Sequence, residues 1–237
     1  MPFTFQSRIR YSEIGEDGFL TLPGIVDYFQ DVSTFQSESL GVGIGYLKER
    51  GLAWILASWQ IEIARFPKLC DPVTAATWPY AFKDFFGYRN FSLSDPDGRM
   101  YAWANSVWIL YDMAHGRPAR VGSDIMEKYE NEPRLDMVYE DRKIRVRGEG
   151  AAEDGFVIGR QHLDTNHHVN NGQYISMAME YLPRESRIGQ MRAEYRSQAH
   201  LGDEVIPCIY REDPYTTVSL NNREGRPFAV VRFKIQQ

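Results

Sequence analysis

The stretch IGRQHLDTNHHVNNGQYISMAME, residues 158–180, decides the fold because it repeats an earlier part of the chain. It aligns without gaps on IRYSEIGEDGFLTLPGIVDYFQD, residues 9–31. Three blocks that recur in the same order indicate a tandem duplication. The two further blocks align residues 59–73 with 191–205, and residues 92–109 with 219–236.

Each copy is expected to contain an extended segment, one long helix and then strands. Pro23 suits the first turn of the first helix, and Pro183 is expected to end the second. The groups SDPDG and NNREG are typical of turns, so each copy should end in a hairpin. One helix followed by mostly antiparallel strands predicts an α+β unit whose sheet wraps the helix. Helical spacing is shown by Ile25, Val26, Phe29 and Val32, and by Tyr174, Ile175, Met177, Ala178, Tyr181 and Leu182.

The duplication sets the expected domain limits. We predict a first domain over residues 1–135, a linker over 136–155 and a second domain over 156–237. The region between the copies is polar and charged, and its stretch SDIMEKY is expected to be helical in part.

Composition excludes several classes of protein. The chain has 237 residues, 43% of them hydrophobic and 14% aromatic, which is ample for a packed core. Its net charge of −5 gives no basic balance for nucleic acid. The longest apolar run, residues 52–57, is far shorter than a membrane span, and two cysteines imply no disulfide framework. We therefore expect a cytoplasmic protein.

Titratable and amide side chains crowd the entrance of the second predicted helix, where His162, His167 and His168 are three of the chain's five histidines. Asn170 or Asn171 suits the N-cap position, which places His168 just outside the positive end of the helix. Backbone N–H groups there can hold negative charge that develops on an oxygen. A neutral imidazole can accept a proton near pH 7. The pattern therefore fits hydrolysis at a carbonyl.

Two other interpretations of this cluster stay open. Asn, Asp and His are common helix-entry residues, so capping alone explains it. A metal ion held by His162, Asp164, His167 and His168 is disfavoured, because adjacent histidines on an extended segment cannot easily face one ion and no cysteine supports the site.

The first copy does not repeat the polar cluster. A purely structural motif would have similar reason to persist at both helix entrances. One polar set and one degenerate partner therefore indicate one active site in the chain. The residues concerned are Asp164, Asn166 and His168 in the second copy, against Gly15, Asp17 and Phe19 in the first.

These motifs resemble those of the acyl-acyl carrier protein (acyl-ACP) thioesterases of plants and bacteria. The family signature D-x-N-x-H-V-N-N-x-x-Y is matched by DTNHHVNNGQY, residues 164–174. GLAWILASWQIEIARFP and TWPYAFKDFFGYRNF are similar to the family too, so the resemblance covers nearly the whole chain. It implies two tandem hot-dog domains, each a curved antiparallel sheet wrapped around a central helix. It also implies hydrolysis of a fatty acyl-ACP thioester, which releases the free fatty acid and terminates chain elongation.

The chain departs from the family pattern on a later strand. Where the family often has E-Y-R-R-E-C, with Glu and Cys proposed for catalysis, this chain reads EYRSQA, with Gln198 and Ala199. A cysteine nucleophile is thus excluded there, and an amide is no base at neutral pH. The remaining proton acceptors are His168 and Asp164, of which we favour His168, with Asp164 orienting it or Asn166. Asn166 and helix N–H groups would polarise the thioester carbonyl, and Gln198 would position the water.

Residues that contact the acyl chain and the carrier protein are indicated less sharply. The first domain is expected to hold the acyl-chain pocket, although aromatic residues are equally typical of a core. Basic linker residues would suit an acidic carrier protein, and alternating charge on a solvated strand explains them equally well. The pocket candidates are Tyr28, Phe29, Phe35, Trp54, Trp59, Phe85 and Phe86, and the basic residues are Arg142, Lys143, Arg145 and Arg147.

The partner that the resemblance implies is acyl carrier protein with its phosphopantetheine-linked acyl chain. No cofactor, metal, nucleic acid or membrane span is expected. Two fused domains allow a monomer, and a homodimer through a sheet edge is also compatible with the sequence. An acyl-CoA thioesterase is the alternative enzyme, with a hot-dog dehydratase a weaker one. From a different class, a non-catalytic acyl-binding hot-dog module is favoured by the missing Glu and Cys and opposed by the intact set of Asp164, Asn166 and His168.

Overall fold

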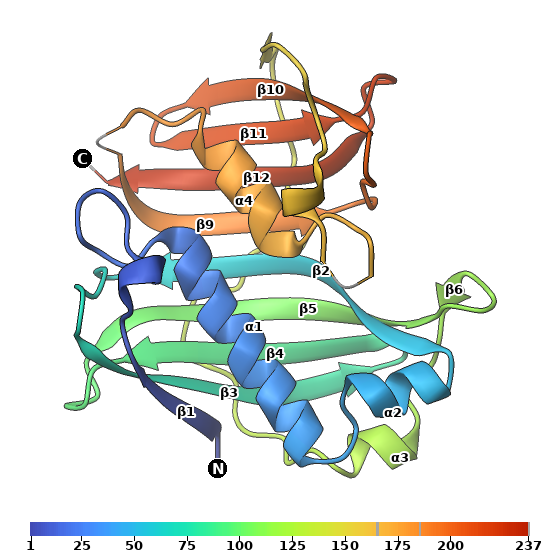
Figure 1. Ribbon diagram of the computed structural model, residues 1–237. Coiled ribbons are helices and arrows are strands. Elements are labelled where there is room, and N and C mark those ends of the chain that lie inside the picture. The colour runs from blue at the N-terminus through green and yellow to red at the C-terminus, as the bar shows by residue number, and fades with distance from the viewer. Residues whose placement is uncertain (165, 185, 237) are drawn as a thin grey trace. The chain divides into compact units, whose positions relative to one another are not determined.

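The computed structural model describes residues 1–164, 166–184 and 186–236, and it divides into two compact units. The first unit comprises Met1–Ala57 and Ile61–Tyr139, and the second comprises Ser58–Gln60 and Glu140–Gln237. Each unit combines one long helix with a β-sheet (Figure 1), so the α+β prediction is confirmed. In the described ranges, none of the helices has the length and apolar character needed to cross a membrane.

In the first unit the strand order is β1-β3-β4-β5-β2, and α1 packs on β1, β3 and β4. The pairs β1–β3, β3–β4 and β4–β5 are antiparallel. Short β6 (Arg117–Pro118) pairs with β5. The main elements are β1 (Phe3–Arg8), η1 (Tyr11–Glu13), α1 (Leu22–Ser39), α2 (Ile44–Glu49), β2 (Leu52–Ile63), β3 (Pro72–Lys83), β4 (Phe86–Ser94), β5 (Met100–Asp112) and α3 (Ser123–Met126).

Helix α1 forms where the apolar spacing predicts it. The N-cap is Thr21, whose Oγ1 accepts the Gly24 N–H at 3.1 Å, and Pro23 lies in the first turn as predicted. The four residues with helical spacing are all buried. Phe29 packs on Phe91 of β4, with ring centroids 5.2 Å apart and both side chains fully buried. Gly41, with φ of 69°, follows the end of the helix, as expected for a left-handed helix stop.

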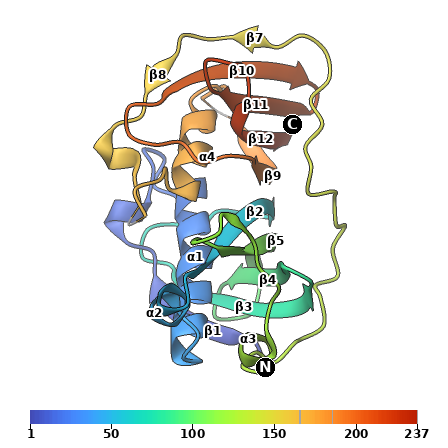
Figure 2. The ribbon, with the colours of Figure 1, turned by 90° about the vertical axis from the view of Figure 1, so that its right-hand side faces the viewer.

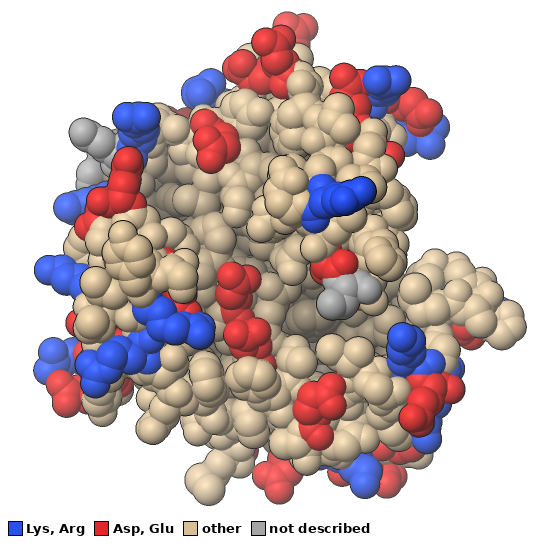
Figure 3. Space-filling view, viewed as in Figure 1, with Lys and Arg blue, Asp and Glu red and all other residues tan. Residues whose placement is uncertain are grey.

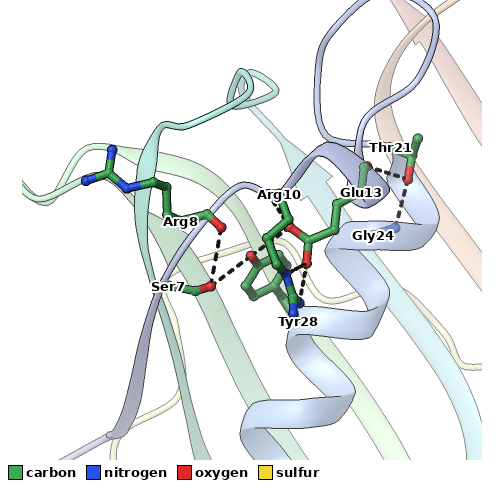
Figure 4. Close-up of polar contacts among 7 residues, drawn as sticks. All are labelled: Ser7, Arg8, Arg10, Glu13, Thr21, Gly24 and Tyr28. Atoms are coloured by element: carbon green, nitrogen blue, oxygen red, sulfur yellow. Dashed lines mark hydrogen bonds and ion pairs between the residues drawn. The ribbon is translucent and has the colours of Figure 1, made fainter.

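Polar contacts fasten the start of α1 to β1 and to the η1 turn (Figure 4). Glu13 accepts the Arg10 N–H at 2.8 Å and the Tyr28 hydroxyl at 3.1 Å. The Tyr28 hydroxyl also lies 3.2 Å from Ser7 Oγ on β1. The chain that enters α1 is therefore fixed both to β1 and to the η1 turn.

In the second unit the strand order is β9-β12-β11-β10-β7, with β8 paired to β10, and α4 packs on β11 and β12. Helix α4 ends at Met179, four residues before Pro183, so the prediction that it extends over Tyr181 and Leu182 was wrong. The N–H groups of those two residues bond carbonyls only three positions back, which makes a tight turn. The elements are β7 (Ala151–Ala152), β8 (Phe156–Val157), η2 (Arg160–His162), α4 (Asn171–Met179), β9 (Arg187–Tyr195), β10 (Glu204–Glu212), β11 (Tyr215–Asn221) and β12 (Pro227–Gln236).

The aligned sequence blocks carry equivalent elements in the two units. Both hairpins predicted from turn residues form, because Asp95 and Asn222 occupy equivalent places. Asp95 Oδ1 accepts the N–H groups of Asp97 and Arg99, and Asn222 Oδ1 does the same for its own turn. The register of the three blocks therefore coincides with helix entrances and hairpin turns rather than with chance matches.

Residues that precede β7 lie along the side of the second sheet opposite α4 (Figure 2). Glu140 pairs with Arg192 of β9, and the Ile144 N–H donates to Glu194 of the same strand at 2.8 Å. Ile144 itself is buried. The segment predicted as a linker is thus fastened to a sheet by its first residues, while the exact domain limits stay a prediction. The helix predicted within SDIMEKY is α3.

Candidate functional site

The loop that carries His168 is closed by its own backbone. The Asp164 N–H donates to the His168 carbonyl at 2.8 Å, and Leu163 pairs with Val169 in an isolated bridge. Asp164 Oδ1 accepts the N–H groups of Asn166 at 2.8 Å and His168 at 3.2 Å. The Asp164 carboxylate therefore bonds the main chain of both residues, and its role in orienting them for catalysis stays a prediction.

Helix α4 begins directly after this loop. Asn170, one of the two predicted caps, is the N-cap, and its Oδ1 accepts the Gly172 N–H at 2.8 Å. The Asn170 N–H donates to the His162 carbonyl at 2.9 Å. His168 thus lies two residues before the N-cap, beside the positive end of a helix, as the sequence predicted.

The first unit builds the same loop with different side chains. The Gly15 N–H donates to the Phe19 carbonyl at 2.9 Å, which matches the bond from Asp164 to His168. Because the backbone closes equally well around Phe19, the imidazole of the second unit is not needed to form the loop. Two further pairs of bonds match: Leu20 to Pro67 with Val169 to Ala199, and Thr21 to Glu13 with Asn170 to His162.

The other two histidines of the cluster have structural explanations. His162 Nδ1 accepts the Gly159 N–H at 3.0 Å, in the place where Glu13 caps the first unit's turn. His167 has a left-handed backbone with φ of 62°, where the first unit has Gly18 with φ of 78°. In the part of the chain that the structure describes, three or more His, Cys, Asp or Glu side chains do not gather in a way that could hold a metal ion.

The His168 imidazole is half-buried and contacts a second imidazole. Its ring centroid lies 4.9 Å from that of His200, with the planes at 79°. Burial lowers the pKa of His168 below its ordinary value, and the positive charge of His200 and His167 lowers it further, against the opposing effect of Asp164. A neutral imidazole is therefore favoured at the helix entrance.

The segment after β9 is fixed to the same loop and helix. The Ala199 carbonyl accepts the Val169 N–H at 3.0 Å, and the Ala199 N–H donates to the Tyr174 hydroxyl at 2.9 Å. Burial raises the pKa of Tyr174 to about 12, so this hydroxyl stays protonated. Gln198, the fourth predicted site residue, precedes Ala199 and is exposed to solvent.

Sequence reasoning missed the contact between His168 and His200. The signal was available in the second aligned block, where AHLGD lies on PKLCD. That register pairs His200 with Lys68, whose ammonium lies 5.4 Å from the Phe19 ring centroid. A side chain at this position therefore packs over the loop residue in both units.

Residues predicted to contact the acyl chain and the carrier protein lie in varied environments. Tyr28, Phe29 and Trp59 are buried, whereas Phe35 is 42% exposed and packs on Phe5. Trp54 is partly buried against a small core around α2 and α3. Among the basic residues, Arg142 is half-buried, and the exposed ones are Lys143, Arg145 and Arg147.

Comparison with known proteins matches both halves of the chain to one family. The sequence model of the acyl-ACP thioesterase N-terminal domain matches residues 2–129, and that of the C-terminal domain matches residues 145–224. An acyl-[acyl-carrier-protein] hydrolase of Cuphea viscosissima is 26% identical over 225 residues, covering 87% of this chain and 54% of that protein. An oleoyl-acyl carrier protein thioesterase of Arabidopsis thaliana is 27% identical over 218 residues, covering 83% of this chain and 60% of that protein.

The chain spans about half the length of the Cuphea protein that it matches. Two solved structures share its fold. An acyl-ACP thioesterase from Bacteroides thetaiotaomicron has a TM-score of 0.90 at 21% identity, covering 98% of this chain and 97% of its own. The 12:0-ACP thioesterase from Umbellularia californica has a TM-score of 0.86 at 19% identity, covering 99% and 97%. These likenesses confirm the tandem hot-dog fold.

Proposed function

We propose that this chain, which belongs to the acyl-ACP thioesterase family, hydrolyses the thioester of a fatty acyl chain on acyl carrier protein and releases the free fatty acid. One observation carries the proposal. The same loop backbone stands at both helix entrances, and only the second unit fills it with an imidazole. His168 there is held beside the N-terminus of α4 and favoured in its neutral form.

His168 would act as the general base. A ring nitrogen takes a proton from water as the water oxygen attacks the thioester carbon, which produces a tetrahedral oxyanion. When the carbon–sulfur bond then breaks, the imidazolium returns its proton to the departing thiolate of the phosphopantetheine arm. One thioester and one water thus give one carboxylic acid and one thiol.

The neighbouring groups would stabilise charge and position water. Asn166 is exposed at the mouth of the loop, so its amide is available to the carbonyl oxygen. Backbone N–H groups at the α4 entrance would add to that stabilisation. Gln198 is exposed on the adjoining segment and would hold the attacking water, and Asp164 would act by shaping the loop.

Hydrolysis of medium- and long-chain acyl carrier proteins by the wild type and by His168→Ala tests the proposal. Loss of a general base is expected to lower kcat by about 100- to 10,000-fold. Wild-type turnover with full activity in the folded variant would reject His168 as the base. Binding of acyl chains without turnover by the wild type would support the acyl-binding module, and faster hydrolysis of acyl-CoA would support the alternative enzyme.

We propose that Lys143, Arg145 and Arg147 form a docking surface for the acidic carrier protein. All three side chains are exposed. The segment that bears them is bonded to β9 through Glu140 and Ile144, so the three charges are held on an ordered part of the chain. The face seen in Figure 3, on which the helices lie, has Lys and Arg interspersed with Asp and Glu. On the segment before β7, the three exposed basic residues would form a local strip that guides the encounter with an acidic partner.

Reversal of these three charges to Glu should raise KM for acyl carrier protein and leave KM for a small soluble thioester unchanged. A matched variant with Lys48, Lys83 and Arg117 changed to Glu alters the net charge equally at exposed sites of the first unit. Equal effects of the two triple variants would reject a specific docking surface. Added salt should raise the KM of the wild type for acyl carrier protein more than it raises the KM of the docking variant.

Two further expectations remain part of the proposal. Cytoplasmic location is checked by cell fractionation with an antibody against the chain. Self-association through a sheet edge is checked by light scattering over a range of protein concentration, where a constant monomer mass would reject the homodimer.

A further inference from the structure

His200 is the residue whose ring meets the His168 ring, and it comes from a separate segment of the chain. The two ring centroids are 4.9 Å apart, and the planes cross at 79°, an edge-to-face contact. Neither the signature around α4 nor the positions of Gln198 and Ala199 include this residue. The contact adds a second imidazole to the proposed site.

The backbone around His200 holds it in this place. Asp203 Oδ2 accepts the His200 N–H at 2.8 Å, and the Asp203 N–H donates to the His200 carbonyl at 3.1 Å. The same carboxylate oxygen lies 3.7 Å from His200 Nδ1. Ala199, directly before His200, is fully buried and bonded to both the loop and α4. His200 therefore stands on a fixed support, with a carboxylate beside its ring.

The first unit shows which part of this arrangement belongs to the fold. There Lys68 lies over the Phe19 ring, and Asp71 Oδ2 accepts the Lys68 N–H at 2.9 Å. Packing of the two positions and the carboxylate cap are thus common to both units. At these equivalent positions the first unit has a lysine and a phenylalanine, whereas the second has two imidazoles in contact beside the proposed base.

We propose that His200 is a positioning residue of the thioesterase site: it supports the His168 ring, and when protonated it opposes a second positive charge there, which keeps His168 available as a base. The inference rests on the proposed function. The lowered pKa of His168, caused first by burial and next by His200, agrees with it. The charged and titratable groups that face His168 are Asp164 and His167 from its own loop and His200 from the segment after β9. Tyr174 from α4 is neutral, because burial raises its pKa to about 12. Asp203 lies behind His200 and bonds its N–H group.

Two variants separate support from charge. His200→Phe keeps an aromatic ring and removes the ionisable group, whereas His200→Ala removes both. His115→Phe is the matched control, because His115 is an exposed histidine at the β5–β6 turn of the first unit. The measurement is kcat for acyl carrier protein against pH, together with NMR titration of the His168 ring.

For His200→Phe we expect the acid limb of the kcat–pH curve and the NMR midpoint of His168 to move up by about half a pH unit. This is the shift that Coulomb repulsion produces between two charges centred 4.9 Å apart in a medium close to water. Activity should then fall more at pH 6 than at pH 8. His200→Ala should show the same shift and a further fall in kcat at every pH. His115→Phe should leave both curves unchanged.

Unchanged curves in both His200 variants would overturn the inference, as would an equal loss of kcat at all pH values with the limb in place. The NMR titration decides the electrostatic part even without turnover. A wild type that hydrolyses no thioester would therefore defeat the proposed function, while the His168 midpoint still tests the role of His200.

Discussion

The hydrogen bond between Tyr174 and Ala199 gives the sharpest structural prediction, because the first unit omits both partners. Tyr174 is 3% exposed and Ala199 is fully buried, so Tyr174→Phe leaves a buried N–H without its acceptor. Such a group costs about 1–3 kcal/mol. For a chain of this size that corresponds to a fall in Tm of roughly 2–12 °C.

The first unit supplies the compensating change. Ile25 stands where the second unit has Tyr174, and Pro67, which has no N–H, stands where it has Ala199. The double variant Tyr174→Phe with Ala199→Pro removes donor and acceptor together, and a matched removal is close to neutral. Its loss of stability should therefore be smaller than the sum of the two single losses.

Thermal and urea unfolding of the wild type, both single variants and the double variant close a double-mutant cycle. We expect a coupling of about 1 kcal/mol or more in favour of the double variant. Simple addition of the single effects would show that the bond is not what joins this segment to α4, and would remove the support argued for Gln198 and His200.

Three further predictions concern the helix entrances. His167→Gly should change stability by less than about 1 kcal/mol, because relief of the left-handed backbone offsets the flexibility of glycine, and Gly18 already fills this place in the first unit; a larger loss in urea unfolding would contradict this. Burial and the nearby carboxylates of Asp31 and Glu13 raise the pKa of Asp27, a residue of α1, to about 6. Folding therefore favours the protonated form of Asp27, so the stability of the protein should fall as pH rises from about 4 to 6. Asp27→Asn should flatten that fall in Tm, and an unchanged slope would refute it. Asn170→Ala should cost about 1 kcal/mol of unfolding free energy through loss of the Gly172 cap, and no loss would show the cap to be dispensable.

Sequence patterns predicted what depends on neighbours along the chain. Helical spacing and Pro23 placed α1, and the turn groups placed both hairpins. The duplication could be detected in the sequence for the same reason, since each aligned block contains a structural element that is formed by neighbouring residues. The end of α4 was misplaced because Tyr181 and Leu182 continue the apolar spacing of the helix. Their N–H groups bond carbonyls only three residues back, so the chain forms a tight turn after Met179 instead.

The candidate site was predictable only in part. His168 and the cap at Asn170 belong to one continuous motif, whereas the contact of His168 with His200 joins segments distant in sequence. A pattern search along the chain weighs each histidine by its immediate neighbours. Only the fold shows that the AHLGD turn rests against the loop at α4.

Hydrolysis of acyl carrier protein thioesters by the wild type and by His168→Phe tests the role of the imidazole directly. Phenylalanine is the residue that the first unit places in the same loop, so the variant should fold with an unchanged unfolding midpoint. We predict turnover by the wild type and a loss of about 100- to 10,000-fold in the variant. A folded variant that keeps the wild-type rate would show that the imidazole at the α4 entrance is not the base.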